Sequence, residues 1–411
     1  MNKRTIDDID VAGRRVLIRL DLNVPLDDGR ITDDRRITAA LPTLGKLIAG
    51  GGRLILMSHL GRPKGDPEKD KAFTLAPVAR RLSELLGREV TFAPASVGPG
   101  VEKMVNNLAN GDVCLLENLR FNTAETIKDK KAKDDPPLRH TKDDFAARLA
   151  RLADVYVNDA FGTCHRDNAS MLTVPQMMEG KPRVVGYLVK KELDFLSNAV
   201  AAPARPFVVV LGGAKVSDKI GVIENLIDKC DTILVGGAMC YTFFAAEGRA
   251  VGKSLVERDF LDKATHLRQK AGDKLRLPTD SIAAAEIKSG IATQTCTEAI
   301  PDHLMGLDIG PATVQAYRDI LAAAKTIVWN GPMGVFETRP FNAGTVAIAH
   351  ALAQATSRGA VTIIGGGDSA AAIDAAGLAD KVTHISTGGG ASLELLEGKK
   401  FAAIEVLDDA R

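Results

Sequence analysis

Short apolar runs alternate with longer segments of helical periodicity along the whole chain. Runs such as 207–211 and 361–365 are apolar on both faces, as a buried parallel strand should be. The alternation predicts parallel sheets covered by helices. We expect strands at 15–20, 53–58, 89–93, 112–116, 154–158 and 183–187 in the first half, and at 207–211, 232–236, 326–330, 361–365 and 382–386 in the second.

Helical spacing is clear at 74–86, at 218–229 and over 189–200, where the last stripe is stopped by the prolines of 201–206. At 411 residues the chain exceeds what one hydrophobic core usually serves. We therefore expect two α/β domains joined by a hinge helix. The predicted boundaries are 1–187 for the first domain, 188–206 for the helix and hinge, 207–396 for the second domain, and 397–411 for a segment that could return to the first.

The residues that follow the strands differ between the two halves. In the first half they are charged or polar, and in the second they are glycines. Arginine-tipped loops suit a small anion held by bidentate contacts, and glycine loops let backbone N–H groups approach phosphate. The pattern predicts two anionic ligands, one in each half. The loops concerned include Arg19-Leu20-Asp21-Leu22-Asn23, His59-Leu60-Gly61-Arg62, Gly212-Gly213, Gly236-Gly237 and Gly365-Gly366-Gly367-Asp368-Ser369.

Four arginines of the first half fall at or after strand ends, where ligands of open α/β sheets bind. They are Arg36, Arg62, Arg120 and Arg166, accompanied by His59 and His165. Their convergence in a chain of balanced charge indicates a phosphorylated carboxylate. Arg19, Asp21 and Asn23 alternate and would share one face of an extended segment, although Arg19 and Asp21 could instead pair with each other.

In the second half, Lys215 and Lys219 stand near the start of a predicted helix, where like charges and the helix dipole are unfavourable. A bound polyphosphate would reverse that penalty; the alternative is a solvated helix start. Asp368, beside three glycines, is best explained as a Mg²⁺ ligand. The loop 387–390, which contains Gly389, would add an anion cradle at another helix start.

The balance of charged residues and the cysteine content limit which kinds of partner and which cell compartment are expected. The chain has 53 Lys+Arg against 52 Asp+Glu, which argues against nucleic acid or a membrane surface as the main partner. The five cysteines are scattered, which fits reduced thiols in a cytoplasmic protein. The segment 127–144 is charged and interrupted by prolines, and we expect a solvated surface excursion without a chemical role.

Three alternatives have weaker support. The segment 247–254 looks like a P-loop, but Glu247 stands where that motif needs glycine. An NAD-dependent dehydrogenase would also place glycine loops on parallel sheets, yet the G-x-G-x-x-G fingerprint is missing after a strand. A nucleotide-binding regulator without catalysis is disfavoured because Arg36, Lys215, Lys219 and Asp368 are all present.

Several long motifs, in one order along nearly the whole chain, resemble the phosphoglycerate kinase family. They are Arg-Leu-Asp-Leu-Asn-Val-Pro (19–25), Ser-His-Leu-Gly-Arg-Pro-Lys-Gly (58–65), Glu-Asn-Leu-Arg-Phe (117–121), Val-Asn-Asp-Ala-Phe-Gly-Thr (157–163), Gly-Gly-Ala-Lys-Val-Ser-Asp-Lys (212–219), Gly-Leu-Asp-Ile-Gly-Pro (306–311) and Trp-Asn-Gly-Pro-Met-Gly-Val-Phe-Glu (329–337). The resemblance implies two Rossmann-like domains and reversible, Mg²⁺-dependent phosphoryl transfer between ATP and 3-phosphoglycerate, giving ADP and 1,3-bisphosphoglycerate. It also favours a cytoplasmic monomer that closes about its hinge.

The resemblance also assigns residues to ligands. For 3-phosphoglycerate on the first domain it implies Asp21, Leu22, Asn23, Arg36, His59, Leu60, Gly61, Arg62, Arg120 and Arg166. For Mg-ATP or Mg-ADP on the second it implies Lys215, Lys219, Gly236, Gly237, Gly306, Glu337, Gly366, Gly367, Asp368 and Ser369, with Asp368 on the metal. Arg36, Lys215, Lys219 and Gly389 would act on the phosphoryl group in flight.

Two places depart from the family pattern. The family commonly reads His-Arg-Ala-His-Ala-Ser, whereas this chain reads His165-Arg166-Asp167-Asn168-Ala169-Ser170, preceded by Cys164 in place of alanine. Because Arg166 is kept, we expect altered packing or charge there rather than lost activity. The segment 127–144 also looks longer than usual.

Overall fold

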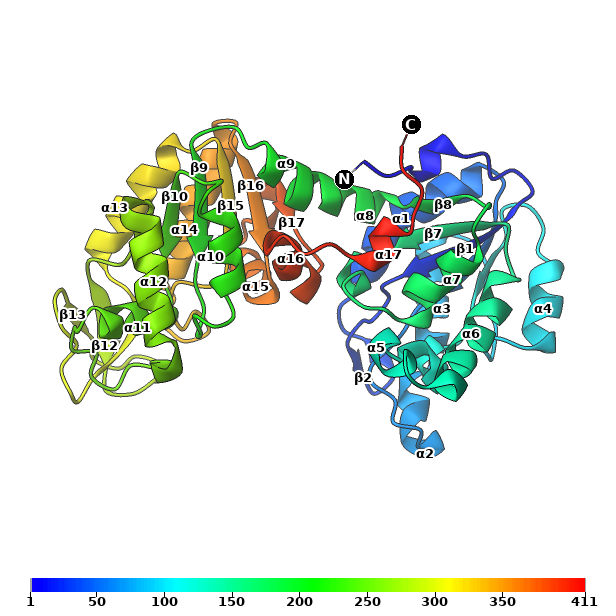
Figure 1. Cartoon of the computed structure of the whole chain (residues 1–411), viewed down its shortest axis with the longest axis horizontal. Coiled ribbons are helices and arrows are strands. Elements are labelled where there is room, and N and C mark those ends of the chain that lie inside the picture. The colour runs from blue at the N-terminus through cyan, green and yellow to red at the C-terminus, as the bar shows by residue number, and fades with distance from the viewer. Residues whose placement is uncertain (1, 411) are drawn as a thin grey trace. The chain divides into compact units, whose positions relative to one another are not determined.

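The computed structural model describes residues 2–410, which form two compact units, residues 2–194 with 400–410 and residues 195–399. Each unit contains a six-stranded sheet in which all neighbouring strands are parallel, with helices packed against it (Figure 1). The predicted fold class, parallel sheets covered by helices, is confirmed.

The sheet of the first unit has the strand order β5-β6-β4-β1-β7-β8. Its strands are β1 Arg15–Leu20, β4 Arg53–Met57, β5 Val90–Phe92, β6 Val113–Leu115, β7 Val155–Asp159 and β8 Arg183–Val185. Its helices are α1 Arg35–Ala49, α2 Pro67–Asp70, α3 Ala76–Leu86, α4 Pro99–Asn106, α5 Asp129–Ala132, α6 Pro136–Ala150, α7 Val174–Met177, α8 Tyr187–Leu193 and α17 Ala402–Glu405; a hairpin joins β2 Leu26–Asp27 to β3 Arg30–Ile31.

The sheet of the second unit has the order β11-β10-β9-β15-β16-β17. Its strands are β9 Phe207–Leu211, β10 Thr232–Val235, β11 Leu275–Arg276, β15 Thr326–Asn330, β16 Val361–Gly365 and β17 His384–Ile385. Its helices are α9 Ala199–Ala201, α10 Ile220–Leu226, α11 Met239–Ala246, α12 Leu261–Ala271, α13 Pro311–Ala323, α14 Ala343–Ser357, α15 Gly367–Ala375 and α16 Gly390–Leu396.

The centres of the sheets are buried on both faces, as the apolar runs predicted. Ile18 of β1 is in register with Leu56 of β4 and Val157 of β7, and all three are fully buried. Burying one such side chain contributes roughly 1.5–3 kcal/mol relative to leaving it exposed. The core holds the strands in register, and their register fixes where the strand-end loops begin.

The predicted helix over 189–200 is confirmed as a continuous helical run. It begins as α8, becomes π-helical over Asp194–Asn198 and ends as α9. The helix expected at 218–229 is shorter and begins at Ile220. Sequence reading did not anticipate β11, or the antiparallel sheet of β12 Ser281–Ala284, β13 Gln294–Cys296 and β14 Met305–Ile309.

The segment 127–144 is mostly exposed, as predicted for a solvated surface excursion, but it is more regular than its prolines suggested. The segment contains α5 and the start of α6, and the prolines at 136 and 137 stand in the first turn of α6, where a missing N–H costs little. Lys142 of α6 is fully buried. The high charge of the segment gave no indication that it contains a helix with one buried lysine.

Candidate active site

In the first unit, an ion pair lies where the strand order reverses, between β1 and β7. Ligands of open α/β sheets bind in the crevice at such a point. Asp21 follows β1, and Arg36 in the first turn of α1 donates to its carboxylate. A Cβ on Gly162, which follows β7, would lie 2.5 Å from Asp21 Oδ2. Two strand ends and a helix start therefore meet at this pair.

His59, after β4, is buried and has an unusual partner. Its Nδ1 lies 3.2 Å from Nη2 of Arg19, and because a guanidinium only donates, Nδ1 accepts. Burial lowers the pKa of His59 well below its usual value, and the charges of Arg19 and Arg120 lower it further. A neutral ring that accepts at Nδ1 carries its proton on Nε2, so Nε2–H is the donor it can offer a ligand.

Arg19 lies beneath the site and not on it. It is 1% exposed, and its Nε donates to Ser170 Oγ over 2.9 Å. Ser170 in turn donates from Oγ and N to the buried carboxylate of Glu125, over 2.7 and 2.9 Å. Both interpretations of Arg19, a face shared with Asp21 and a pair with it, are therefore wrong. β1 ends at Leu20, so the alternation of an extended strand no longer holds at Asp21.

Gly61 connects two further predicted residues. Its N–H donates to Asn23 Oδ1 over 2.8 Å, and its carbonyl accepts from Arg120 Nη1 over 2.6 Å. Its φ is +60°, and a Cβ there would come within 2.3 Å of the Phe73 ring, so only glycine fits. Burial lowers the pKa of Arg120 to about 10, and the neighbouring charge of Arg166 contributes. Positive charge is thus concentrated here without a matching set of carboxylates.

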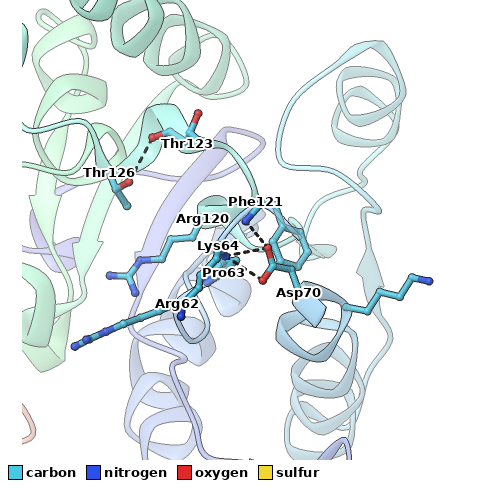
Figure 2. A pocket seen from close by; sticks show the side chains of 10 residues that line it. Arg62, Pro63, Lys64, Asp70, Arg120, Phe121, Thr123 and Thr126 are labelled. Carbon is cyan, nitrogen blue, oxygen red and sulfur yellow. Dashed lines mark hydrogen bonds between the residues drawn. The ribbon is translucent and has the colours of Figure 1, made fainter. Parts of the chain in front are cut away.

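A pocket of about 600 Å³ lies beside Arg62 and Arg120 (Figure 2). Asp70 is the one acidic residue among those that line it, and its carboxylate is held by the N–H groups of Lys64 at 3.0 Å and Gly65 at 2.7 Å. Figure 2 shows both arginine side chains extending away from Asp70. Neither arginine pairs with Asp70, and Arg120 Nε has no hydrogen-bond partner among the described residues, so it can donate to an anion. The other lining residues are Pro63, Lys71, Phe121, Thr123 and Thr126.

Arg166 completes what we call the arginine cluster, Arg36, Arg62, Arg120 and Arg166. Its charge lowers the pKa of both His59 and Arg120. Two predicted residues do not face the cluster with their side chains. Leu22 and Leu60 are buried, and their N–H groups donate to Ser58 Oγ at 2.9 Å and Asn118 Oδ1 at 3.2 Å. They shape the loops that carry their neighbours.

In the second unit, a pocket of about 420 Å³ lies at the corresponding edge of the sheet, where the order reverses between β9 and β15. We call it the glycine pocket. Of the predicted nucleotide residues it is lined by Gly237, Gly306, Glu337 and Asp368. Leu255 and Ile287 also line it and are exposed, at 52% and 54%. Apolar side chains that face solvent beside glycine backbone suit a flat, apolar ligand group.

The glycines after β9 and β10 do not offer free amides, contrary to the prediction from sequence. The N–H groups of Gly212 and Gly213 donate to Asn330 O and Pro332 O, at 3.0 and 2.9 Å. Those of Gly236 and Gly237 donate to Leu211 O and Met333 O, both at 2.8 Å. A Cβ on Gly237 would come within 2.4 Å of the nitrogen of Gly213. These glycines let three strand-end loops pack together as the floor of the pocket.

The first turn of α15 is the place where backbone N–H groups remain available to a ligand. The first N–H groups of a helix have no partner within it, and here they belong to Gly367 and its neighbours, with Asp368 exposed beside them. Gly366, at φ +88°, makes the turn from β16. Ser369 is buried, and its Oγ accepts from the N–H of Gly331 over 2.6 Å, so its side chain secures the floor. Gly389 precedes α16 in the same way, at φ +52°.

The two lysines occupy different surroundings. Lys219 directly precedes α10, and its ammonium group donates to Asn330 Oδ1 at the end of β15. Burial lowers the pKa of Lys219, while the charges of Asp218 and Asp368 act in the opposite direction. Lys215 is exposed. Neither lysine is among the residues that line the glycine pocket.

The residues present fit a phosphate-bound magnesium ion. Mg²⁺ is usually held by one or two carboxylates together with substrate phosphates, and Asp368 supplies one such carboxylate beside a helix start. Among residues 2–410 no group of three or more His, Cys, Asp and Glu side chains is arranged to bind a metal by itself. Most of the ligands would come from phosphate and water.

Sequence reasoning missed the residues beneath the site. Glu125, Ser170 and Lys142 are fully buried and polar, and their contacts span distant parts of the chain. Asn330, which accepts a hydrogen bond from Lys219, stood out in the sequence only as part of the 329–337 motif. No periodicity marks such residues. A charged residue inside an otherwise apolar helix face is the one signal that Lys142 offered.

These two edges define a class. The protein is built from two parallel α/β units, one carrying the arginine cluster and the other a glycine-lined pocket with Lys219 and Asp368 near it. Such a pair of sites suits the transfer of a charged group between two anionic ligands.

Comparison with known proteins identifies the family. The family model described as phosphoglycerate kinase matches residues 6–399. A phosphoglycerate kinase of Rhodopirellula baltica is 54% identical over 414 residues, covering 100% of each chain, and one of Thermosipho africanus is 54% identical over 409 residues, covering 98% of this chain and 97% of the other. The structure of phosphoglycerate kinase from Coxiella burnetii superposes with a TM-score of 0.86 at 40% identity, covering 98% of each chain. The chain belongs to the phosphoglycerate kinase family, whose members transfer phosphate to a carboxyl group.

The predicted enzyme class is therefore confirmed. As for the membrane, none of the helices formed by residues 2–410 combines the length and the apolar character needed to span one.

Proposed function

We propose that this chain catalyses reversible, Mg²⁺-dependent phosphoryl transfer between ATP and the carboxylate of 3-phosphoglycerate, in glycolysis and gluconeogenesis. The observation that carries the proposal is the contrast between the two strand-order reversals. One is occupied by guanidinium groups and a neutral histidine, the other by a glycine-lined pocket next to Lys219 and Asp368. A small acid with a phosphate suits the first, and a nucleotide suits the second.

The reaction needs no general base. A carboxylate with a pKa of about 4 is already ionised at neutral pH and can attack phosphorus directly. His59 agrees with this, because its lowered pKa keeps it neutral and its Nδ1 is engaged with Arg19. Its role is to donate a hydrogen bond that orients the acid.

The obstacle is electrostatic. Two unit negative charges 4 Å apart repel by about 4 kcal/mol at an effective dielectric constant of 20. Arg36 on the acid side and Lys215 and Lys219 on the nucleotide side are the groups of this chain that offset this repulsion as charge moves during transfer. Arg36 is held at a helix start by Asp21, so it is oriented before a ligand arrives. In phosphoryl transfer such positioning supplies nearly all of the catalysis.

The nucleotide would lie along the glycine pocket. Leu255 and Ile287 would contact the base, and Gly306 and Glu337 line the same space. The free amides of α15 would receive the phosphates, and Asp368 would hold Mg²⁺ against them. When bound, the metal neutralises phosphate charge. Because the ligands lie on separate units, transfer requires a state in which they meet, and we propose closure about 188–206. The cytoplasmic location and the monomeric state remain predictions.

Replacement of Arg36 tests the separation of the two sites. Arg36→Ala should weaken 3-phosphoglycerate binding by about tenfold or more, the loss expected for a charge-assisted bidentate contact. ADP affinity should not change, because Arg36 belongs to the first unit. Titration calorimetry with each ligand separately gives both affinities.

The matched control is Arg35→Ala, the adjacent arginine of α1, whose side chain is 69% exposed and pairs with Asp33. Its two affinities should equal those of the unmodified protein. A loss of ADP affinity in Arg36→Ala would contradict the assignment of one ligand to each unit.

A further inference from the structure

Lys142 of α6 is completely buried, and its ammonium group has two partners. Nζ lies 2.6 Å from Asp129 Oδ1 and 2.6 Å from the backbone oxygen of Asp167. Lysine is almost never fully buried unless it is paired. The two partners belong to different segments, α5 and the loop that carries Arg166. Lys142 therefore joins that loop to the helical segment 129–150.

A second bond closes the arrangement. The N–H of Asp129 donates to Asp167 Oδ2 over 2.7 Å, and Asp129 Oδ1 also accepts from Arg139 Nη1 over 3.1 Å. Asp129, Lys142 and Asp167 thus form a closed ring, which we call the lysine clasp. It fixes the residue directly after Arg166 through both its backbone and its side chain.

The same loop is held on its other side. Ser170 donates to Glu125 through two hydrogen bonds. Glu125 follows Arg120 in the chain, and Ser170 follows Arg166. Two arginines of the cluster are therefore carried by segments that are tied to each other by Glu125–Ser170 and by the lysine clasp.

The clasp joins two segments that are well separated along the chain. Asp129 and Lys142 belong to the charged segment 127–144, and Asp167 follows Arg166. These contacts make the two segments one unit of structure.

We propose that Lys142 is a positioning residue for Arg166, and that the lysine clasp sets the affinity of the first unit for its acidic ligand. The proposal rests on the proposed binding of 3-phosphoglycerate by the arginine cluster. Without the ammonium group the carbonyl of Asp167 loses its partner, and the loop moves toward solvent to satisfy it. A displacement of about 1 Å in a binding group is enough to lose much of its effect.

Lys142→Met tests the proposal, since methionine fills similar space without the charge. The KM for 3-phosphoglycerate should rise about tenfold, as for one weakened charge-assisted contact, while the KM for Mg-ATP stays within about twofold. The matched control is Lys131→Met, an exposed lysine of α5, which should leave both values unchanged. A change in both KM values, or in neither, would overturn the proposal.

Variants of Asp167 give the same test in a chain whose buried lysine stays paired with Asp129. Asp167→Ala removes the acceptor of the Asp129 N–H and should raise the KM for 3-phosphoglycerate several-fold. Asp167→Asn keeps an acceptor oxygen and should restore it. If the alanine and asparagine variants have the same KM, the clasp does not position Arg166.

Arg166→Ala distinguishes a failure of the proposed ligand assignment from a failure of the positioning role of Lys142. If it leaves the KM for 3-phosphoglycerate unchanged, the proposed ligand assignment fails. If it raises that KM while Lys142→Met does not, the assignment stands and the positioning role of Lys142 is refuted.

Discussion

At the scale of single residues, the glycines at the strand ends of the second unit have two distinct roles. Those after β9 and β10 use their N–H groups on neighbouring backbone and exist because the loops approach too closely for a Cβ. Gly366 and Gly367 instead place the first turn of α15 at the sheet edge. The glycines predicted an anion-binding loop after β9 and β10 and another at the start of α15. Of these two, only the start of α15 leaves backbone N–H groups that could bind an anion.

The two lysines of the 212–219 loop also differ. Lys219 is held by Asn330, whereas Lys215 is exposed and has no hydrogen-bond partner among residues 2–410. Because its side chain makes no hydrogen bond that stabilises the described part of the fold, removing Lys215 should cost little stability in the ground state. Lys215 is thus suited to meet charge that develops only during transfer.

We expect Lys215→Ala to lower kcat by about 10²-fold or more, the loss typical of one transition-state donor. The KM for Mg-ATP should change much less, because Lys215 does not line the glycine pocket. Steady-state kinetics in both directions measures this. Lys381→Ala, at another exposed lysine of the second unit, is the control. An unchanged kcat in the Lys215 variant would refute the role.

At the scale of elements, each unit has a buried carboxylate that accepts hydrogen bonds from the backbone N–H groups at the start of a helix. Asp159 Oδ1 accepts from the N–H groups of Leu188 and Val189 in α8, at 2.9 and 3.1 Å. Asp308 Oδ2 accepts from Gly344 in α14, at 2.7 Å. Burial raises the pKa of Asp159 to about 6 and that of Asp308 to about 7. Both residues come from motifs that resemble the family, and both act by fixing helices.

The raised pKa of Asp308 predicts a pH dependence of stability. Since the folded-state pKa lies above the ordinary value of 3.8, the unfolded chain releases this proton more readily, and stability is lost as pH rises toward 7. The free energy of unfolding should fall by about 4 kcal/mol from this group between pH 4 and pH 8. Urea unfolding followed by Trp329, the one tryptophan and buried in β15, reports the second unit.

In Asp308→Asn the corresponding part of the pH slope should disappear, because the amide does not titrate. Asp302→Asn, at an exposed carboxylate six residues before Asp308, is the control and should keep the slope of the unmodified protein. Equal slopes in the Asp308 variant and the unmodified protein would show that Asp308 stays ionised throughout.

The sequence predicted elements well where burial is two-sided and poorly where it is not. All eleven expected strands are present, although the last is reduced to His384–Ile385. β11, β12 and β13 were missed because they are short and partly exposed, so they lack a continuous apolar run. β14 was missed because Gly306 and Asp308 interrupt its apolar residues. Charge at strand ends predicted the arginine cluster. It could not predict Glu125 or Lys142, which are fixed by contacts between distant segments.

At the scale of the whole molecule, both units follow one plan. In each, the chain first adds strands on one side of its first strand, three in the first unit and two in the second, and then returns to add the remainder on the other side. The reversal leaves a crevice beside the first strand, and different residues follow that strand in the two units: Asp21 and Asn23 in the first, Gly212 and Gly213 in the second. One topology thus provides two sites with different chemistry.

This plan predicts that each ligand stabilises its own unit first. A ligand at 100 times its Kd stabilises the fold that binds it by about 2.7 kcal/mol, and amides near the site should exchange more slowly in proportion. In hydrogen exchange, 3-phosphoglycerate alone should protect the loops 21–24 and 59–62, and Mg-ADP alone the loops 212–219 and 365–369. In Arg36→Ala, protection by 3-phosphoglycerate should fall while that by Mg-ADP remains. Protection of the same unit by both ligands would contradict the division of binding between the two sheets.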